Sequence, residues 1–177
     1  MGGSALVAFS GTQVDARIAE LVRDPRVAGV TLYGPLNIDN ALQTQRLTED
    51  LRTAASRELL IGVDQEGGQL VAAGPETTHF AGNMALGAVG DEDLARLIGQ
   101  AIGRELAALG INVNYAPVAD VATKPDNPSL GIRSFGEDPA AVARLTAATV
   151  TGMQSVGVAA TLKHFPGKGE AEVDPHL

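Results

Sequence analysis

Short apolar runs alternate with segments of helical periodicity along this chain, and this alternation constrains the fold more than any other feature. The runs are rich in Val, Ile and Leu, as in strands that are buried on both faces. They occupy residues 4–9, 29–34, 59–64, 111–121 and 157–164. Helices are expected at 13–24, 39–56, 91–109 and from 138 to shortly before 157. The resulting βαβαβαβαβ order predicts an α/β fold with a parallel sheet.

Two architectures fit this order, a doubly wound sheet and a (β/α)8 barrel of the TIM type. A barrel typically takes about 250 residues, whereas the chain has 177, so its length favours the doubly wound sheet. Both architectures gather active-site residues at the carboxyl ends of parallel strands. The positions of the polar residues therefore separate the two only weakly.

Composition and charge narrow the classes of partner. The chain is 45% hydrophobic and has a formal net charge of −8 at pH 7, and it contains no cysteine for disulfides or thiolate metal sites. No Lys/Arg cluster offsets the negative charge, so neither nucleic acid nor an anionic membrane is an expected partner. The first residues have no basic segment and too short an apolar run for a signal peptide. A cytoplasmic location is expected, with an exported form whose leader has been removed as the alternative.

Reactive side chains stand where three of the expected strands end. Asp64 closes one strand, Asp120 closes the next, and Lys163-His164 closes the last. An acid after a strand is often only a helix cap, but three such ends together indicate one polar pocket. The GVDQEGG segment lacks the spacing of a phosphate loop, and the acids Asp64 and Glu66 would repel phosphate. Such carboxylates are suited instead to the hydroxyls of a neutral polyol such as a sugar.

Three further groups lie in loops. Arg133 stands between glycines in LGIRSFGEDP, where a lone arginine is more often structural than functional. His164, Asp174 and His176 could ligate zinc, but their spacing matches no compact ligand motif, so neither a metal nor a cofactor is expected. Asp174-Pro175-His176 places a carboxylate two residues before an imidazole, which is the outline of an acid/base pair. A surface turn with an incidental histidine is the alternative.

The segment KHFPGKG-EAEV-DPH at 163–176 resembles the signature of the family 3 glycoside hydrolases, in the branch of bacterial β-N-acetylglucosaminidases. That signature reads K-H-F-P-G-H-G, four variable residues, then D-S-H. Further blocks of the family match in order, namely GVDQEGG, NYAPVADV, NPSLGIRSFGEDP and GVAATLKHFPG. The resemblance spans essentially the whole chain.

The resemblance implies a (β/α)8 barrel of which residues 1–177 are the N-terminal part of a single catalytic domain, with about the first five βα units. It implies hydrolysis of terminal β-linked N-acetylglucosamine from cell-wall-derived glycosides, with retention of configuration. Asp174 and His176 then correspond to the acid/base pair. Asp64, Arg133, Lys163 and His164 fall on positions that hold the sugar hydroxyls.

The chain also departs from the family pattern. The family nucleophile is an aspartate on a later strand, and no residue in 1–177 matches it, so the chain alone is expected to be an inactive fragment. Gln69 and Ala72 stand where the family usually has arginines, and Lys168 and Pro175 replace a histidine and a serine. The alternatives are a degenerate sugar-binding homologue and one half of a split enzyme. Expected partners are a carbohydrate substrate and either a missing C-terminal half or a second copy paired through open sheet edges.

Overall fold

The computed structural model describes residues 5–124 and 126–172 and contains a five-stranded parallel sheet. The strands are β1 (Ala5–Ala8), β2 (Val27–Thr31), β3 (Leu60–Val63), β6 (Val113–Asn114) and β7 (Ala159–Ala160). Their order in the sheet is β1-β2-β3-β6-β7, so each strand lies beside its predecessor and the order never reverses. A doubly wound sheet reverses its order at a switch point. This sequential strand order confirms the barrel-type fold. The doubly wound sheet, which the length of the chain favoured, is therefore wrong.

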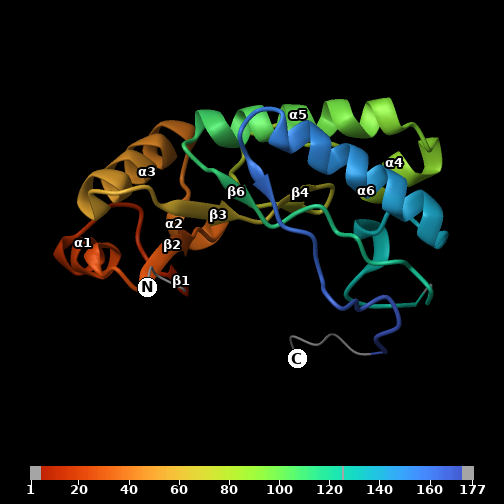
Figure 1. Ribbon diagram of the computed structural model, residues 1–177, viewed down its shortest axis with the longest axis horizontal. Coiled ribbons are helices and arrows are strands. Elements are labelled where there is room, and N and C mark those ends of the chain that lie inside the picture. Colours follow the sequence, from red (N-terminus) through yellow and green to blue (C-terminus); the bar gives the residue numbers. More distant parts are fainter. Residues whose placement is uncertain (1–4, 125, 173–177) are drawn as a thin grey trace.

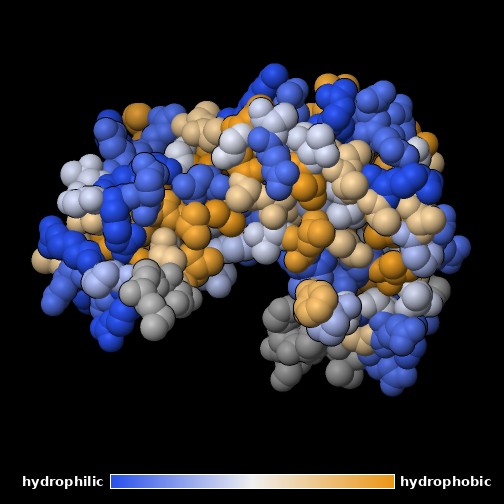
Figure 2. Space-filling model, viewed as in Figure 1, coloured by the Kyte–Doolittle hydropathy of each residue, from blue (hydrophilic) through white to orange (hydrophobic). Residues whose placement is uncertain are grey.

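The helices are α1 (Ala16–Arg23), α2 (Gly34–Asn37), α3 (Ala41–Ala55), α4 (Asn83–Val89), α5 (Glu92–Ala108) and α6 (Pro139–Gln154), with a 3-10 turn η1 (Gly131–Arg133). In Figure 1, α3, α5 and α6 lie along the upper side of the strands, and the lower side is open between α1 and the loops near η1. Figure 2 shows the molecular surface hollowed on that same side. No helix within the described ranges is both long and apolar enough to cross a membrane.

Side-chain caps explain where four of the helices begin. Asp15, Asn40, Asp91 and Asp138 each stand before a helix and accept hydrogen bonds from backbone N–H groups of its first turn. Pro139 follows Asp138 at the first helical position, where its missing N–H costs nothing. The four helices that these caps begin are the ones that the hydrophobic periodicity of the sequence predicts.

The main core lies between the sheet and its helices. Its fully buried side chains come from β2 and β3 on one side and from α1, α3 and α5 on the other, and include Ile18, Val30, Leu47, Leu51, Ile61, Val63 and Leu106. A smaller cluster of Leu86, Ala95, Phe135, Val142 and Leu145 joins α4, α5 and α6. These two clusters fix the helices against the sheet, so the carboxyl ends of the strands are held in place.

The structure refines the expected strands. The apolar run at 111–121 forms a strand only at Val113–Asn114, because Pro117 has no N–H to donate to a ladder. Parallel pairing resumes at Val118, which bridges Lys163 beyond the end of β7. Five elements have no counterpart in the sequence prediction: α2, α4, η1 and the two strands of an antiparallel hairpin, β4 (Gln65–Gly67) and β5 (Leu70–Val71).

Candidate active site

A pocket of about 610 Å³ opens at the carboxyl ends of the strands. Asp64 directly follows β3, Lys163 and His164 come after β7, and Arg133 ends η1. The structure therefore brings together all four residues that the sequence resemblance assigned to sugar binding. The whole lining consists of Leu32, Tyr33, Gly34, Pro35, Asp64, Gln69, Leu70, Ala72, Arg133, Lys163 and His164.

Two carboxylates and two cations form an ion-pair cluster at the polar end of this pocket. Lys163 Nζ lies 2.6 Å from Asp64 Oδ1 and also contacts Glu66 Oε1. Arg133 makes a two-pronged contact with Glu66, with Nε 2.8 Å from Oε2 and Nη2 2.7 Å from Oε1. The formal charges of the four side chains cancel, so the cluster gives the pocket many hydrogen-bonding groups without net charge.

Burial and charge oppose each other at Glu66, whose side chain is only 2% exposed. Burial by itself would raise the pKa of Glu66, but hydrogen bonds from Arg133 and Lys163 outweigh it and hold the pKa below its usual value. The hydrogen bond to Glu66 in turn raises the pKa of Arg133. Glu66 is therefore an ionised, fixed anchor for both cations, and a proton donor or acceptor role does not suit it.

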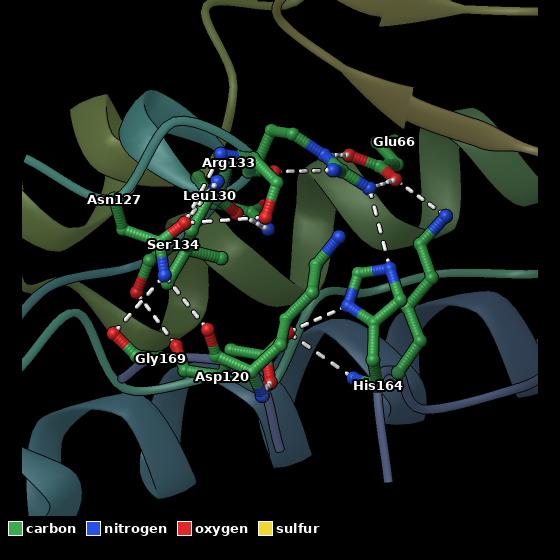
Figure 3. Close-up of polar contacts among 12 residues, drawn as sticks. Glu66, Asp120, Asn127, Leu130, Arg133, Ser134, His164 and Gly169 are labelled. Carbon is green, nitrogen blue, oxygen red and sulfur yellow. Dashed lines mark hydrogen bonds and ion pairs between the residues drawn. The ribbon is translucent and has the colours of Figure 1, made fainter. Parts of the chain in front are cut away.

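His164 lies between this cluster and a second buried acid (Figure 3). Its Nδ1 is 2.6 Å from Asp120 Oδ2, and its Nε2 is 3.4 Å from Arg133 Nη2. Burial lowers the pKa of His164 below its usual value, and the positive charges of Lys168 and Arg133 lower it further. The hydrogen bond to Asp120 and the negative charge of Asp120 raise the pKa but do not outweigh these effects. The imidazole is therefore neutral at pH 7.

Some polar groups in the pocket remain open to a ligand. Within the described ranges Asp64 Oδ2 has no hydrogen-bond partner, while Oδ1 holds Lys163. Lys163 uses two of its three donors on Asp64 and Glu66. Asp64 can thus accept a hydrogen bond and Lys163 can donate one, which matches the donor-and-acceptor character of a hydroxyl group.

The proposed acid/base pair, Asp174 and His176, lies outside the described residues. The sequence places Asp120 in the polar pocket and Glu66 beside Asp64, but the resemblance assigned neither a role, although Glu66 holds both cations and Asp120 holds His164. Their position at or just after strand ends is the signal that points to them. Among residues 5–124 and 126–172, no three His, Cys, Asp or Glu side chains are grouped so that they could hold a metal ion.

Comparison with known proteins identifies the family of the chain. Residues 4–177 match the model of the glycosyl hydrolase family 3 N-terminal domain. The chain is 39% identical over 174 residues to β-hexosaminidase A of Pseudoalteromonas piscicida, covering 93% of this chain and 29% of that protein. It is 36% identical over 178 residues to a β-hexosaminidase of Stenotrophomonas maltophilia, covering 97% and 52%. The chain thus spans from less than a third to about half of these relatives.

Solved structures give the same result. A family 3 β-N-acetylglucosaminidase from Paenibacillus sp. superposes with a TM-score of 0.92 at 40% identity, over 97% of this chain and 33% of that one. NagZ from Neisseria gonorrhoeae, solved with N-trifluoroacetyl-D-glucosamine, superposes with a TM-score of 0.93 at 31% identity, over 99% and 53%. The fold, the ordered motifs and these matches together show that the chain belongs to glycosyl hydrolase family 3, as an N-terminal domain sequence.

Proposed function

We propose that residues 1–177 form the N-terminal part of the single catalytic barrel of a β-N-acetylglucosaminidase, which releases terminal β-linked N-acetylglucosamine from cell-wall-derived glycosides. The observation that carries this proposal is the neutral ion-pair cluster at the strand ends, with Asp64 and Lys163 still able to bind a hydroxyl group. Relatives that are named β-hexosaminidase or β-N-acetylglucosaminidase support the choice of sugar.

The proposed roles divide the site into sugar-holding and proton-transferring groups. Asp64, Arg133, Lys163 and His164 hold the ring hydroxyls. His176 protonates the leaving-group oxygen and later takes a proton from water, and Asp174 orients its imidazole. The configuration is retained through a covalent glycosyl-enzyme, which needs a carboxylate nucleophile from a later strand. The chain alone is therefore expected to bind sugar but not to cleave it.

A second candidate is a sugar-binding protein without catalysis. Gln69 and Ala72 both line the pocket, and neither brings a charge to it. The family usually has arginines at these two positions, so this side of the pocket makes weaker polar contacts with a sugar than the family pattern would. Binding would then persist while positioning of the sugar for cleavage is lost.

Calorimetric titration of the chain with N-acetylglucosamine tests the sugar-holding roles. Asp64→Asn should weaken binding by at least about tenfold, because an amide cannot both hold Lys163 and accept from the sugar as a carboxylate does. Asp93→Asn, at a side chain that is 85% exposed on α5, is the matched control and should leave binding unchanged. Equal binding by the wild-type and Asp64→Asn proteins would contradict the proposed site.

Catalysis is tested by fusing the chain to the unmatched C-terminal part of the Stenotrophomonas maltophilia β-hexosaminidase. The fusion should hydrolyse an aryl N-acetyl-β-glucosaminide, and the chain alone should not. His176→Ala should lower turnover of natural glycosides by roughly 10²–10⁴-fold, and turnover of an aryl glycoside with a good leaving group far less. A fusion that binds the sugar but turns over neither substrate favours the second candidate.

The proposed cellular location is the cytoplasm, following from the sequence expectation. Cell fractionation with an antibody against the chain tests it, and recovery in the exported fraction would contradict it.

A further inference from the structure

The buried side chain of Asp120 holds three N–H groups at once. Oδ2 accepts from the backbone N–H of His164 at 3.1 Å and lies 2.6 Å from Nδ1 of the same residue, while Oδ1 accepts from the backbone N–H of Lys168 at 2.8 Å. The side chain is only 1% exposed. Asp120 therefore lies beneath the imidazole and does not line the sugar pocket (Figure 3).

These contacts determine which nitrogen of His164 carries the proton. An ionised carboxylate only accepts hydrogen bonds, so a neutral imidazole beside Asp120 must carry its hydrogen on Nδ1. The other ring nitrogen agrees, because Arg133 Nη2, which can only donate, lies 3.4 Å from Nε2. The single lone pair of Nε2 thus faces Arg133 Nη2 across this 3.4 Å.

We propose that Asp120 is a positioning residue that fixes His164 as the Nδ1–H tautomer, so that Nε2 is an acceptor. In the complex, a hydroxyl group of the bound sugar replaces Arg133 Nη2 as the donor to Nε2. The inference rests on the proposed function for the identity of the ligand but not for the tautomer. With the opposite tautomer, an N–H on Nε2 would face the donors of Arg133. The pocket would also lose an acceptor beside Asp64 and would hold a hydroxyl less well.

The same carboxylate also fixes the turn that follows His164. Asn127 holds that turn from its other side, because its Nδ2 donates to the carbonyl oxygens of Lys168 at 2.7 Å and Gly169 at 3.1 Å. A Cβ on Gly169 would collide with the backbone oxygen of Val121, so only glycine lets the turn pass this close. Asp120 thereby joins the imidazole and the backbone of Lys168 into one rigid unit.

Replacement of Asp120 by asparagine separates the tautomer role from a general packing role. The shape is kept, but one acceptor oxygen becomes an NH₂ group. Whichever way the amide is turned, that NH₂ group faces a donor, either at His164 or at the backbone N–H of Lys168. Asp138→Asn is the matched control, because Asp138 also accepts from two backbone N–H groups but contacts no histidine.

The experiment is ¹⁵N NMR of the imidazole groups in the protein near pH 7.5. The chain has three histidines, so the variants His79→Gln and His176→Gln assign the His164 signals. Wild-type His164 should show a protonated Nδ1 and a bare Nε2, and Asp138→Asn should match it. Asp120→Asn should populate both tautomers. An Nε2–H pattern in the wild type, or an unchanged pattern in a folded Asp120→Asn variant, would overturn the proposal.

Titration with N-acetylglucosamine separates this inference from the proposed function. Asp120→Asn should weaken binding by about tenfold or more, and Asp138→Asn should not change it. If the wild type binds no sugar, the proposed function fails while the tautomer measurement still decides the role of Asp120. If Asp120→Asn does not fold, the wild-type spectrum decides the tautomer alone. Unchanged sugar binding by a folded Asp120→Asn variant would contradict the positioning role.

Discussion

At the scale of single residues, the site is built on charges that hold one another in place. Glu66 is almost fully buried, and its two cation partners are 14% and 13% exposed. Removing one member of such a buried cluster leaves the remaining charges desolvated and unpaired, which costs more than the interaction itself contributes. The cluster therefore ties the shape of the pocket to the stability of the molecule.

Glu66→Gln should lower the free energy of unfolding by about 3 kcal/mol, because Arg133 and Lys163 then share too few carboxylate oxygens. The measurement is equilibrium urea denaturation followed by circular dichroism. Asp93→Asn breaks an exposed pair with Arg96 on α5 and should cost no more than about 1 kcal/mol. Similar losses in the two variants would mean that the buried cluster contributes no more than a surface pair.

The pH dependence of stability should follow His164 and Glu66. Both groups have a lower pKa in the folded state, so the unfolded chain binds more protons and stability must fall as the pH falls. The loss begins as the pH drops through about 6.5, where an unfolded histidine takes up a proton, and grows below about 4.5, where an unfolded glutamate does. Urea denaturation from pH 7.5 to pH 4 measures it.

His164→Gln removes the group expected to titrate in the upper part of this range, and His79→Gln is its control. The first variant should flatten the stability curve between pH 7.5 and pH 5, and the second should leave its slope unchanged. A wild-type protein that becomes more stable as the pH drops from 7.5 to 5 would contradict the assignment of a neutral, partly buried His164 held by Asp120 and close to Arg133 and Lys168.

Much of the site could be predicted at this scale, and the reason is geometric. Asp64, Lys163 and His164 follow parallel strands, whose carboxyl ends meet at one edge. Arg133 could be included only through the family motif, because its loop has no periodic pattern. The contact of Glu66 with both cations could not be predicted, since Glu66 points into the cluster only because residues 65–71 fold back as a hairpin.

At the scale of elements, α5 and α6 approach closely because their contact is made of glycines. A Cβ on Gly99 would collide with the backbone oxygen of Thr149, and a Cβ on Gly152 would collide with that of Arg96. The contact fixes α6 against its neighbour. The segment between these helices includes β6 and η1 and contains Asp120 and Arg133, so the close approach also helps to place two residues of the site.

Gly152→Ala should therefore lower the free energy of unfolding by roughly 1–3 kcal/mol, through the forced separation of α5 and α6. In a helix without a close neighbour, the same change would raise the free energy of unfolding by about 1 kcal/mol. A loss of stability would therefore indicate that the added methyl group forces the two helices apart. Thr151→Ala, at an exposed neighbouring position, should change stability by no more than about 0.5 kcal/mol. A stabilised Gly152→Ala variant would show that the helices can separate at no cost.

The elements that sequence could predict are those with a strong period and a cap. Capping residues and apolar faces mark the starts of α1, α3, α5 and α6, and all four helices are confirmed. The hairpin, α2 and η1 are short, so their conformation depends on tertiary contacts. The side chain of Asn37, for example, fixes α2 by donating to the backbone oxygens of Phe9 and Gly11.

At the scale of the whole molecule, the two outer strands of the sheet each have an unpaired edge within the part of the chain that the structure describes. Among these residues, β1 pairs only with β2, and β7 pairs only with β6. Beside β7 lies a groove of about 540 Å³, lined mainly by apolar residues of α6 together with Ala119, Val121 and Leu162. Leu162 is 51% exposed and Phe165 is 97% exposed. Unpaired strand edges beside exposed apolar side chains favour pairing with another chain.

The isolated chain should therefore associate with itself in a concentration-dependent way, which sedimentation velocity between about 1 and 100 μM can measure. Leu162→Lys should shift the protein toward monomer, because a charge beside the β7 edge must be desolvated when another strand covers it. Leu42→Lys is the matched control, since Leu42 is 57% exposed on α3 and does not line the groove beside β7, and it should leave association unchanged. A wild-type protein that stays monomeric and unfolds in one sharp transition would contradict the open-edge interpretation. Equal effects of the two lysine variants would place the association on a surface other than the β7 edge.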